Sequence, residues 1–153
     1  MPYLVFSQQS LASLDVGQLT RNARRFFGAE FELRERGEKG GGSEVVMTIA
    51  GANGTPGPPV HARVRPCEGG DYDAAERAER AGRAGGMAGL ARRCPYVWEV
   101  DVGAGAQVGA LRLCSILASV LLGPIMPPEG DTLFGVKGAR ERAERLERSC
   151  ILR

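Results

Sequence analysis

Residues 96–102, with the sequence YVWEVDV, carry the clearest β-strand signal in the chain. Apolar and polar side chains alternate along most of this stretch, in the order Trp98, Glu99, Val100, Asp101 and Val102. Successive side chains of a strand point to opposite faces of a sheet. The stretch therefore predicts a strand with one buried face and one polar face.

Four other segments have the composition or the alternation of a strand, namely residues 3–7, 31–34, 44–50 and 60–66. The last three follow one another with short glycine-rich or proline-rich links, which favours an antiparallel meander. Together with residues 96–102, these segments predict one mixed or antiparallel sheet of about five strands.

Helical signals separate and follow the strands. Asp15 and Gln18 resemble a capping box at the start of a helix that Gly28 is placed to end. A second helix, capped by Asp71 or Asp73, is expected to run to about residue 93 and to break near residues 85–86 because glycine is unfavourable inside a helix. Two more helices are expected over residues 108–122 and 136–150.

The resulting order, β-α-β-β-β-α-β-α-α, predicts a single α+β domain over residues 1–153. Its helices are expected to pack mainly on one face of the sheet, because the polar side chains of the strands need a face in contact with water. Flexible loops are expected near residues 37–43, 51–59 and 103–109, where glycine and proline are concentrated.

The composition narrows the classes of partner. Apolar residues make up 43% of the chain and charged residues 25%, which is typical of a globular domain rather than of a disordered chain. The formal net charge is only +2, with both signs spread along the sequence, so neither nucleic acid nor an anionic membrane is expected as an obligatory partner. The abundance of arginine, alanine and glycine is what a GC-rich bacterial genome produces.

The cysteines and the histidine give no metal-site pattern. No two of the four cysteines have C-x-x-C spacing and His61 is the only histidine, so no metal ion, cofactor or catalytic residue is predicted. The first residues lack the basic and long apolar regions of a secretory signal, which predicts a cytoplasmic location with reduced thiols. Cys94 follows Arg92 and Arg93, whose charges favour a thiolate, so a reactive thiol is kept as an alternative.

His61, Arg63 and Arg65 lie two residues apart and are expected on one face of one strand. Two interpretations follow. The arginines could hold an anion while the histidine moves a proton, which describes a sensor of small anions or nucleotides in which Arg83 could also take part. Alternatively, the three side chains belong to a solvated face and pair across the sheet with Glu99 and Asp101.

Glu99 and Asp101 are the best acidic pair in the chain. Two carboxylates on one face of a strand can share a metal ion or do acid–base work, which describes a minimal metal-dependent hydrolase. The spacing of the other residues identifies no third ligand.

Two further segments could form interfaces. The apolar run over residues 113–126 predicts a helix that must be covered on most sides, either at the centre of the fold or against a second subunit. The loop over residues 127–135 is stiffened by prolines and is expected either to display Asp131 and Phe134 for recognition or to serve only as a connector.

These observations favour a non-catalytic protein-binding or assembly module, of the adaptor, chaperone-like or immunity type, which binds another protein and could form a homodimer. The predicted contact residues are exposed arginines, aromatics and their neighbours, because interfaces favour these types: His61, Arg63, Arg65, Asp131 and Phe134. The alternatives are the small-anion or nucleotide sensor and, third, the hydrolase.

Overall fold

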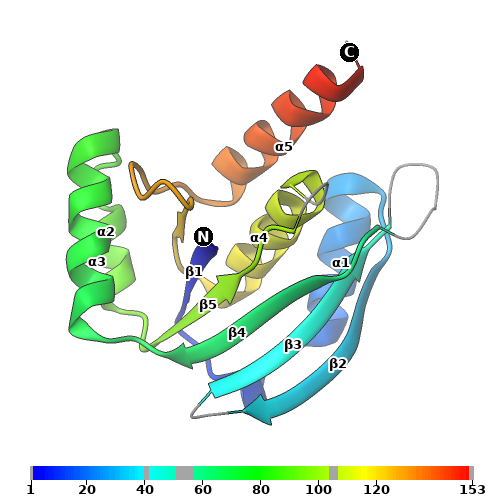
Figure 1. Ribbon diagram of the computed structural model, residues 1–153, viewed down its shortest axis with the longest axis horizontal. Helices are drawn as coiled ribbons and strands as arrows, with labels where there is room; N and C mark the ends of the chain where they lie inside the picture. The colour runs from blue at the N-terminus through cyan, green and yellow to red at the C-terminus, as the bar shows by residue number, and fades with distance from the viewer. Residues whose placement is uncertain (1, 40–41, 51–56, 104–106, 152–153) are drawn as a thin grey trace.

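The computed structural model describes residues 2–39, 42–50, 57–103 and 107–151. Its centre is a six-stranded sheet with the strand order β2-β3-β4-β5-β1-β6, in which every neighbouring pair is antiparallel (Figure 1). The strands are β1 (Tyr3–Ser7), β2 (Phe31–Lys39), β3 (Gly42–Ile49), β4 (Val60–Pro66), β5 (Tyr96–Val100) and β6 (Ile125–Met126). The predicted α+β class and the antiparallel β2-β3-β4 meander are confirmed.

The sixth strand was not expected from the sequence. Ile125 and Met126 continue the apolar run of the preceding helix, so their composition alone does not separate them from it. The helix ends because Leu122 takes a left-handed conformation, with φ of 60°, and Gly123-Pro124 follows. The chain then turns back, and β6 pairs with Leu4 and Val5 of β1.

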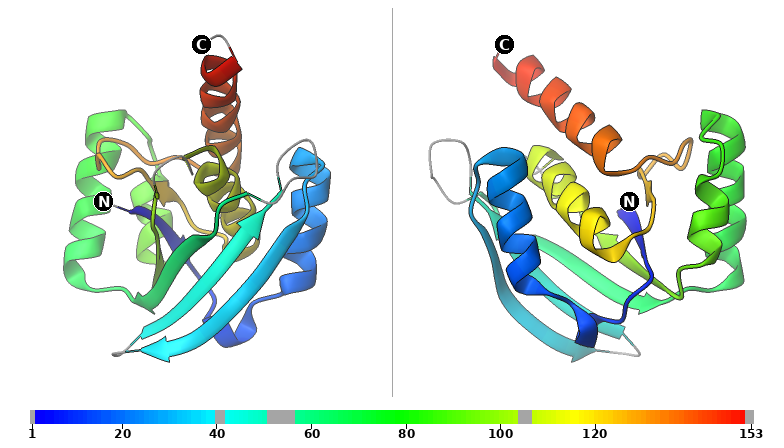
Figure 2. Two further views of the ribbon diagram at one scale, coloured as in Figure 1. Left: turned by 45° about the vertical axis from the view of Figure 1, so that its right-hand side comes forward. Right: turned by 180° about the vertical axis from the view of Figure 1, so that it is seen from behind.

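Helices lie on both sides of the sheet (Figure 2). The side chains of Val5 and Trp98 point into a core with α1 and α4, while those of Phe6 and Val97 point to the opposite face, against α2 and α3. Helix α5 packs on α4. The helical segments are η1 (Leu11–Ser13), α1 (Val16–Phe27), α2 (Gly69–Gly82), α3 (Met87–Arg92), α4 (Gln107–Leu121) and α5 (Val136–Ile151).

The ends of α1 follow its local sequence. The Asp15 side chain accepts a hydrogen bond of 3.0 Å from the backbone N–H of Gln18, as a helix cap does. Gly28 ends the helix in the left-handed region, with φ of 61°, which glycine adopts without strain. Both features were predicted.

Helix α2 begins earlier than predicted. Glu68 caps it, and Asp71 sits in the first turn and accepts a 2.8 Å hydrogen bond from the backbone N–H of Glu68. Asp71 is therefore the reciprocal partner in a capping box rather than the cap itself. The predicted break is confirmed, because Arg83 and Gly86 both have positive φ between α2 and α3.

Helix α4 occupies the central position that was one of its two predicted roles. It contacts β1, β3, α1 and α5, and nearly all its side chains from Ala110 to Leu121 are buried. A second subunit is therefore not needed to cover it. Within the described part of the chain, no helix combines the length and hydropathy needed to cross a membrane.

Most of the predicted flexible loop over residues 37–43 falls on two strands. Strand β2 continues to Lys39 and β3 begins at Gly42, and these two residues are paired, while residues 40–41 lie outside the described residues. Of the other two predicted loops, residues 51–56 and 104–106 lie outside the described residues, while residues 107–109 are the first turn of α4.

The backbone at Gly123 lies very close to the backbone of β1. A Cβ atom there would lie 2.0 Å from the carbonyl oxygen of Phe6, and the neighbouring Pro124 accepts a 3.0 Å hydrogen bond from the Phe6 N–H. Neither backbone segment can move without breaking the contact between β1 and the turn before β6.

We expect Gly123→Ala to destabilise the protein by about 2 kcal/mol or more, because the added methyl group overlaps fixed backbone atoms. Thermal unfolding should show a Tm lowered by roughly 4 °C or more. Gly85→Ala is the matched control, since a Cβ at Gly85 meets nothing within 4 Å and Gly85 does not have positive φ. Equal Tm values for the two variants would contradict the close approach.

Candidate functional site

One face of the sheet is only partly covered. Helices α2 and α3 lie over its β1 and β5 end, whereas no helix of the described chain lies over β2, β3 and β4 (Figure 1). The uncovered part presents Glu35, Glu44, His61, Arg63 and Asp101, and we call this surface the polar sheet face. It borders a hollow of about 850 Å³.

The strand register explains the arrangement of charges on the polar sheet face. Arg63 is paired with Glu44 on one side and with Glu99 on the other. In the next row, His61 is paired with Val46, which is in turn paired with Glu35. In the row of Arg63, charges of opposite sign therefore neighbour one another across the strands, a pattern that favours the sheet.

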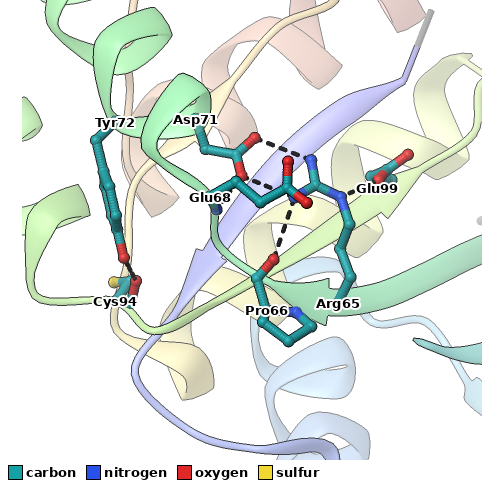
Figure 3. A network of polar contacts seen from close by, with 7 residues as sticks. All are labelled: Arg65, Pro66, Glu68, Asp71, Tyr72, Cys94 and Glu99. Carbon is teal, nitrogen blue, oxygen red and sulfur yellow. Dashed lines mark hydrogen bonds and ion pairs between the residues drawn. The ribbon is translucent and has the colours of Figure 1, made fainter. Parts of the chain in front are cut away.

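Arg65 forms an ion-pair network at the border between the covered and the open part (Figure 3). Its two Nη atoms donate to the two carboxylate oxygens of Asp71 at 2.7 and 2.9 Å, and its Nε donates to Glu99. A further bond of 3.2 Å runs from Nη1 to the carbonyl oxygen of Pro66. One side chain thus joins β4, β5 and the first turn of α2.

The electrostatics of this network are those of a structural ion pair. The Asp71 side chain is only 11% exposed, and hydrogen bonds from Arg65 lower its pKa despite the opposing effect of burial. The same bonds raise the pKa of Arg65. The Nε and both Nη atoms of Arg65 are engaged in hydrogen bonds within the protein, and its predicted binding role stays a prediction.

His61 and Arg63 are exposed, as a solvated face requires, but their neighbours do not favour an anion. Glu44, Glu99 and Asp101 surround them with negative charge, which would repel an anionic ligand. Arg83, the fourth group of the predicted sensor, caps the far end of α2, about 18 Å from Asp71 at 1.5 Å per helical residue. The structure keeps His61, Arg63 and Arg65 on one face of β4 and places Arg83 away from them.

Glu99 and Asp101, the acidic pair of the predicted hydrolase, make different contacts. Glu99 is bonded to Arg65, while Asp101 lies beyond the end of β5 and donates its backbone N–H to the carbonyl of His61. Among the described residues, no group of three or more His, Cys, Asp or Glu is close enough to hold a metal ion. A ligand set for the hydrolase is therefore not found in this part of the chain.

Phe134, in the loop before α5, is not displayed on the surface. Phe134 is buried, because its backbone N–H and C=O both bond Ile125 and its ring packs in the main core. The guanidinium of Arg142 lies 4.4 Å from the ring centroid. Of the two residues predicted to be displayed, only Asp131 is exposed.

Cys94 does not have the surroundings of a reactive thiol. It is buried, and burial raises its pKa to about 11, so that the neutral thiol dominates near pH 7. Its Sγ lies 3.4 Å from the carbonyl oxygen of Leu90, and the charge of Arg92 is directed to Glu76 instead.

A second hollow, near Tyr3, was not predicted. Its polar residues are Tyr3 on β1, Gln107 at the start of α4, Glu129 on the loop after β6, and Arg142 and Arg145 on α5. The spacing of the two arginines, three residues apart on a predicted helix, was the only local sign that they share a face. The residues of β1 and the loop come from distant parts of the sequence.

Comparison of the chain with protein-family models, with curated proteins and with solved structures finds no match. The geometry of the described residues is therefore what supports the functional proposals.

We expect Asp71→Asn to lower the free energy of unfolding at pH 7 by about 1–3 kcal/mol, because Arg65 loses a charged partner in a partly buried site. The folded state lowers the pKa of Asp71, so its contribution is present above the unfolded pKa of about 4 and is lost as the pH falls through the folded pKa. Urea unfolding at pH 7 and at about pH 3 should show a smaller difference between the two proteins in acid.

Asp73→Asn, on the exposed side of the same helix, is the control. Equal effects of the two substitutions at pH 7 would contradict the role of the network.

Proposed function

We propose that this chain is a non-catalytic protein-binding module whose polar sheet face contacts a partner protein. The observation that carries the proposal is the uncovered half of a sheet face, which presents charged side chains of both signs over three adjacent strands. Exposed charges of both signs over three adjacent strands suit the surface of another folded protein, because complementary charges across an interface give specificity.

The rest of the described surface supports recognition by charge rather than by apolar contact. Leu122 is the only large hydrophobic side chain that is exposed among the described residues, so no extended apolar patch is present there. Partner choice would then depend on electrostatic complementarity, which acts mainly on specificity and on the association rate. Such binding weakens as the salt concentration rises.

The β2 edge of the sheet does not favour pairing with a second copy of this chain. The open edge of the sheet is β2, whose register with β3 shifts between Leu33 and Glu35. A shift of this kind, together with the charged side chains of Arg34 and Arg36, disfavours strand-to-strand pairing between copies. A homodimer formed through this edge is therefore not favoured.

The adaptor, chaperone-like and immunity types all remain within this proposal, and so does a cytoplasmic location. The free thiols of Cys67, Cys94 and Cys114 support that location, since the cytoplasm keeps cysteines reduced.

The experiment that tests the proposal is affinity purification from the native host at low and high salt, using the wild-type chain and Glu44→Lys/Asp101→Lys. The two carboxylates are exposed on the polar sheet face, and reversing their charge should reduce partner recovery at least about tenfold. Arg65 is unsuitable as a target because its loss would disturb the network with Asp71.

The matched control is Glu141→Lys/Glu144→Lys, which makes the same change of charge on the exposed side of α5. It should recover the partner as well as the wild type does. Equal recovery by both double variants, or recovery that does not fall as salt is added, would contradict binding through the polar sheet face.

A further inference from the structure

The hollow near Tyr3 lies on the other side of the sheet from the polar sheet face. It has a volume of about 540 Å³ and lies where the start of β1, the first turns of α4, the loop after β6 and the middle of α5 meet. We call it the Tyr3 pocket. The residues that matter for its chemistry are Tyr3, Leu111, Glu129, Arg142, Arg145 and Leu146.

Tyr3 supplies a neutral hydrogen-bond donor. It is half-buried, and its side chain shares the face of the sheet on which α4 packs, because Tyr3 is paired with Val100. Burial, followed by the neighbouring Cys114 and Glu129, raises the pKa of its hydroxyl, while Arg142 acts in the opposite direction. No described residue forms a hydrogen bond with this hydroxyl.

Arg142 supplies a cation that is held in place but not neutralised. Its guanidinium stacks on the ring of Phe134 at 4.4 Å, an arrangement that leaves the N–H groups at the edge of the guanidinium plane able to donate. It has no ion-pair partner among the described residues, in contrast to Arg65 and Arg112. Arg145, three residues further along α5, lines the same pocket.

The remaining groups restrict the ligand. Leu111 is almost fully buried and, with Leu146, gives the pocket an apolar wall. Two guanidinium groups and the single carboxylate of Glu129 leave an excess of one positive charge, which suits a monoanion better than a multiply charged phosphate. A planar carboxylate also matches the donor geometry of arginine.

We propose that the Tyr3 pocket binds a small organic carboxylate, whose anionic group contacts Arg142, Arg145 and the Tyr3 hydroxyl while its apolar body lies against Leu111 and Leu146. This site does not depend on the polar sheet face, so either proposal can fail without the other. It also places anion binding on residues other than His61, Arg63 and Arg65.

The test is titration of the full chain, observed by protein NMR, with hexanoate and 3-phenylpropionate. The neutral amide 3-phenylpropanamide and inorganic phosphate are the comparison ligands. We expect at least one of the two carboxylates to bind, with the largest shift changes in β1, α4 and α5, and to bind at least about tenfold more tightly than the amide, which cannot form charge-assisted bonds.

Variants locate the site. Arg145→Gln and Arg142→Gln should each weaken carboxylate binding about tenfold, and Tyr3→Phe should weaken it several-fold. Arg145 is exposed, so its substitution remains informative if loss of the stack between Arg142 and Phe134 disturbs folding. Arg148→Gln, on the same helix but outside the pocket, should bind as the wild type does.

Four results would overturn the proposal. They are the absence of binding by both carboxylates, equal binding of the amide, tighter binding of phosphate than of either carboxylate, and unchanged affinity in Arg145→Gln.

Discussion

The structure depends on the need to enclose α4. This helix is apolar around nearly its whole circumference, and burying such a helix requires cover on most of its sides. The sheet, α1 and α5 together provide that cover, which places three of the five α-helices on one side of the sheet. Only α2 and α3 remain for the opposite face, and they cover its β1 and β5 end alone. The polar sheet face is thus the consequence of how a small domain distributes a limited number of helices.

Arg65 lies at the border between the apolar, helix-covered part of this second face and its charged, uncovered part. On one side of it, Phe6 and Val97 pack against small alanine side chains of α2 and α3, including Ala75 and Ala91. On the other side, charged residues alternate across β3 and β4. Arg65 holds the first turn of α2 through its bidentate bond to Asp71. Its bond to Glu99 joins the same side chain to β5. A polar contact therefore positions the covering helices over an otherwise apolar cluster.

Much of the secondary structure was predictable because its signals are local. Alternation identified β2, β3, β4 and β5, a short apolar run identified β1, and the Asp15 cap with Gly28 located α1. What could not be predicted involves distant segments: the pairing of β1 between β5 and β6, the bridge that buries Phe134, and the burial that keeps Cys94 neutral. The same reason applies to the sites, since the row of polar residues on β4 is visible in the sequence, whereas a pocket assembled from four separated segments is not.

The place of β1 in the sheet has a consequence for the order of folding. It is the earliest strand in the chain, yet its two hydrogen-bonded neighbours are the last two strands. The meander of β2, β3 and β4 can close through short connections, while β1 must wait until residues 96–100 and 125–126 have been synthesised. Until then the backbone hydrogen-bonding groups and the apolar side chains of β1 lack their partners, so the central core is completed only when the chain has been synthesised as far as residue 126.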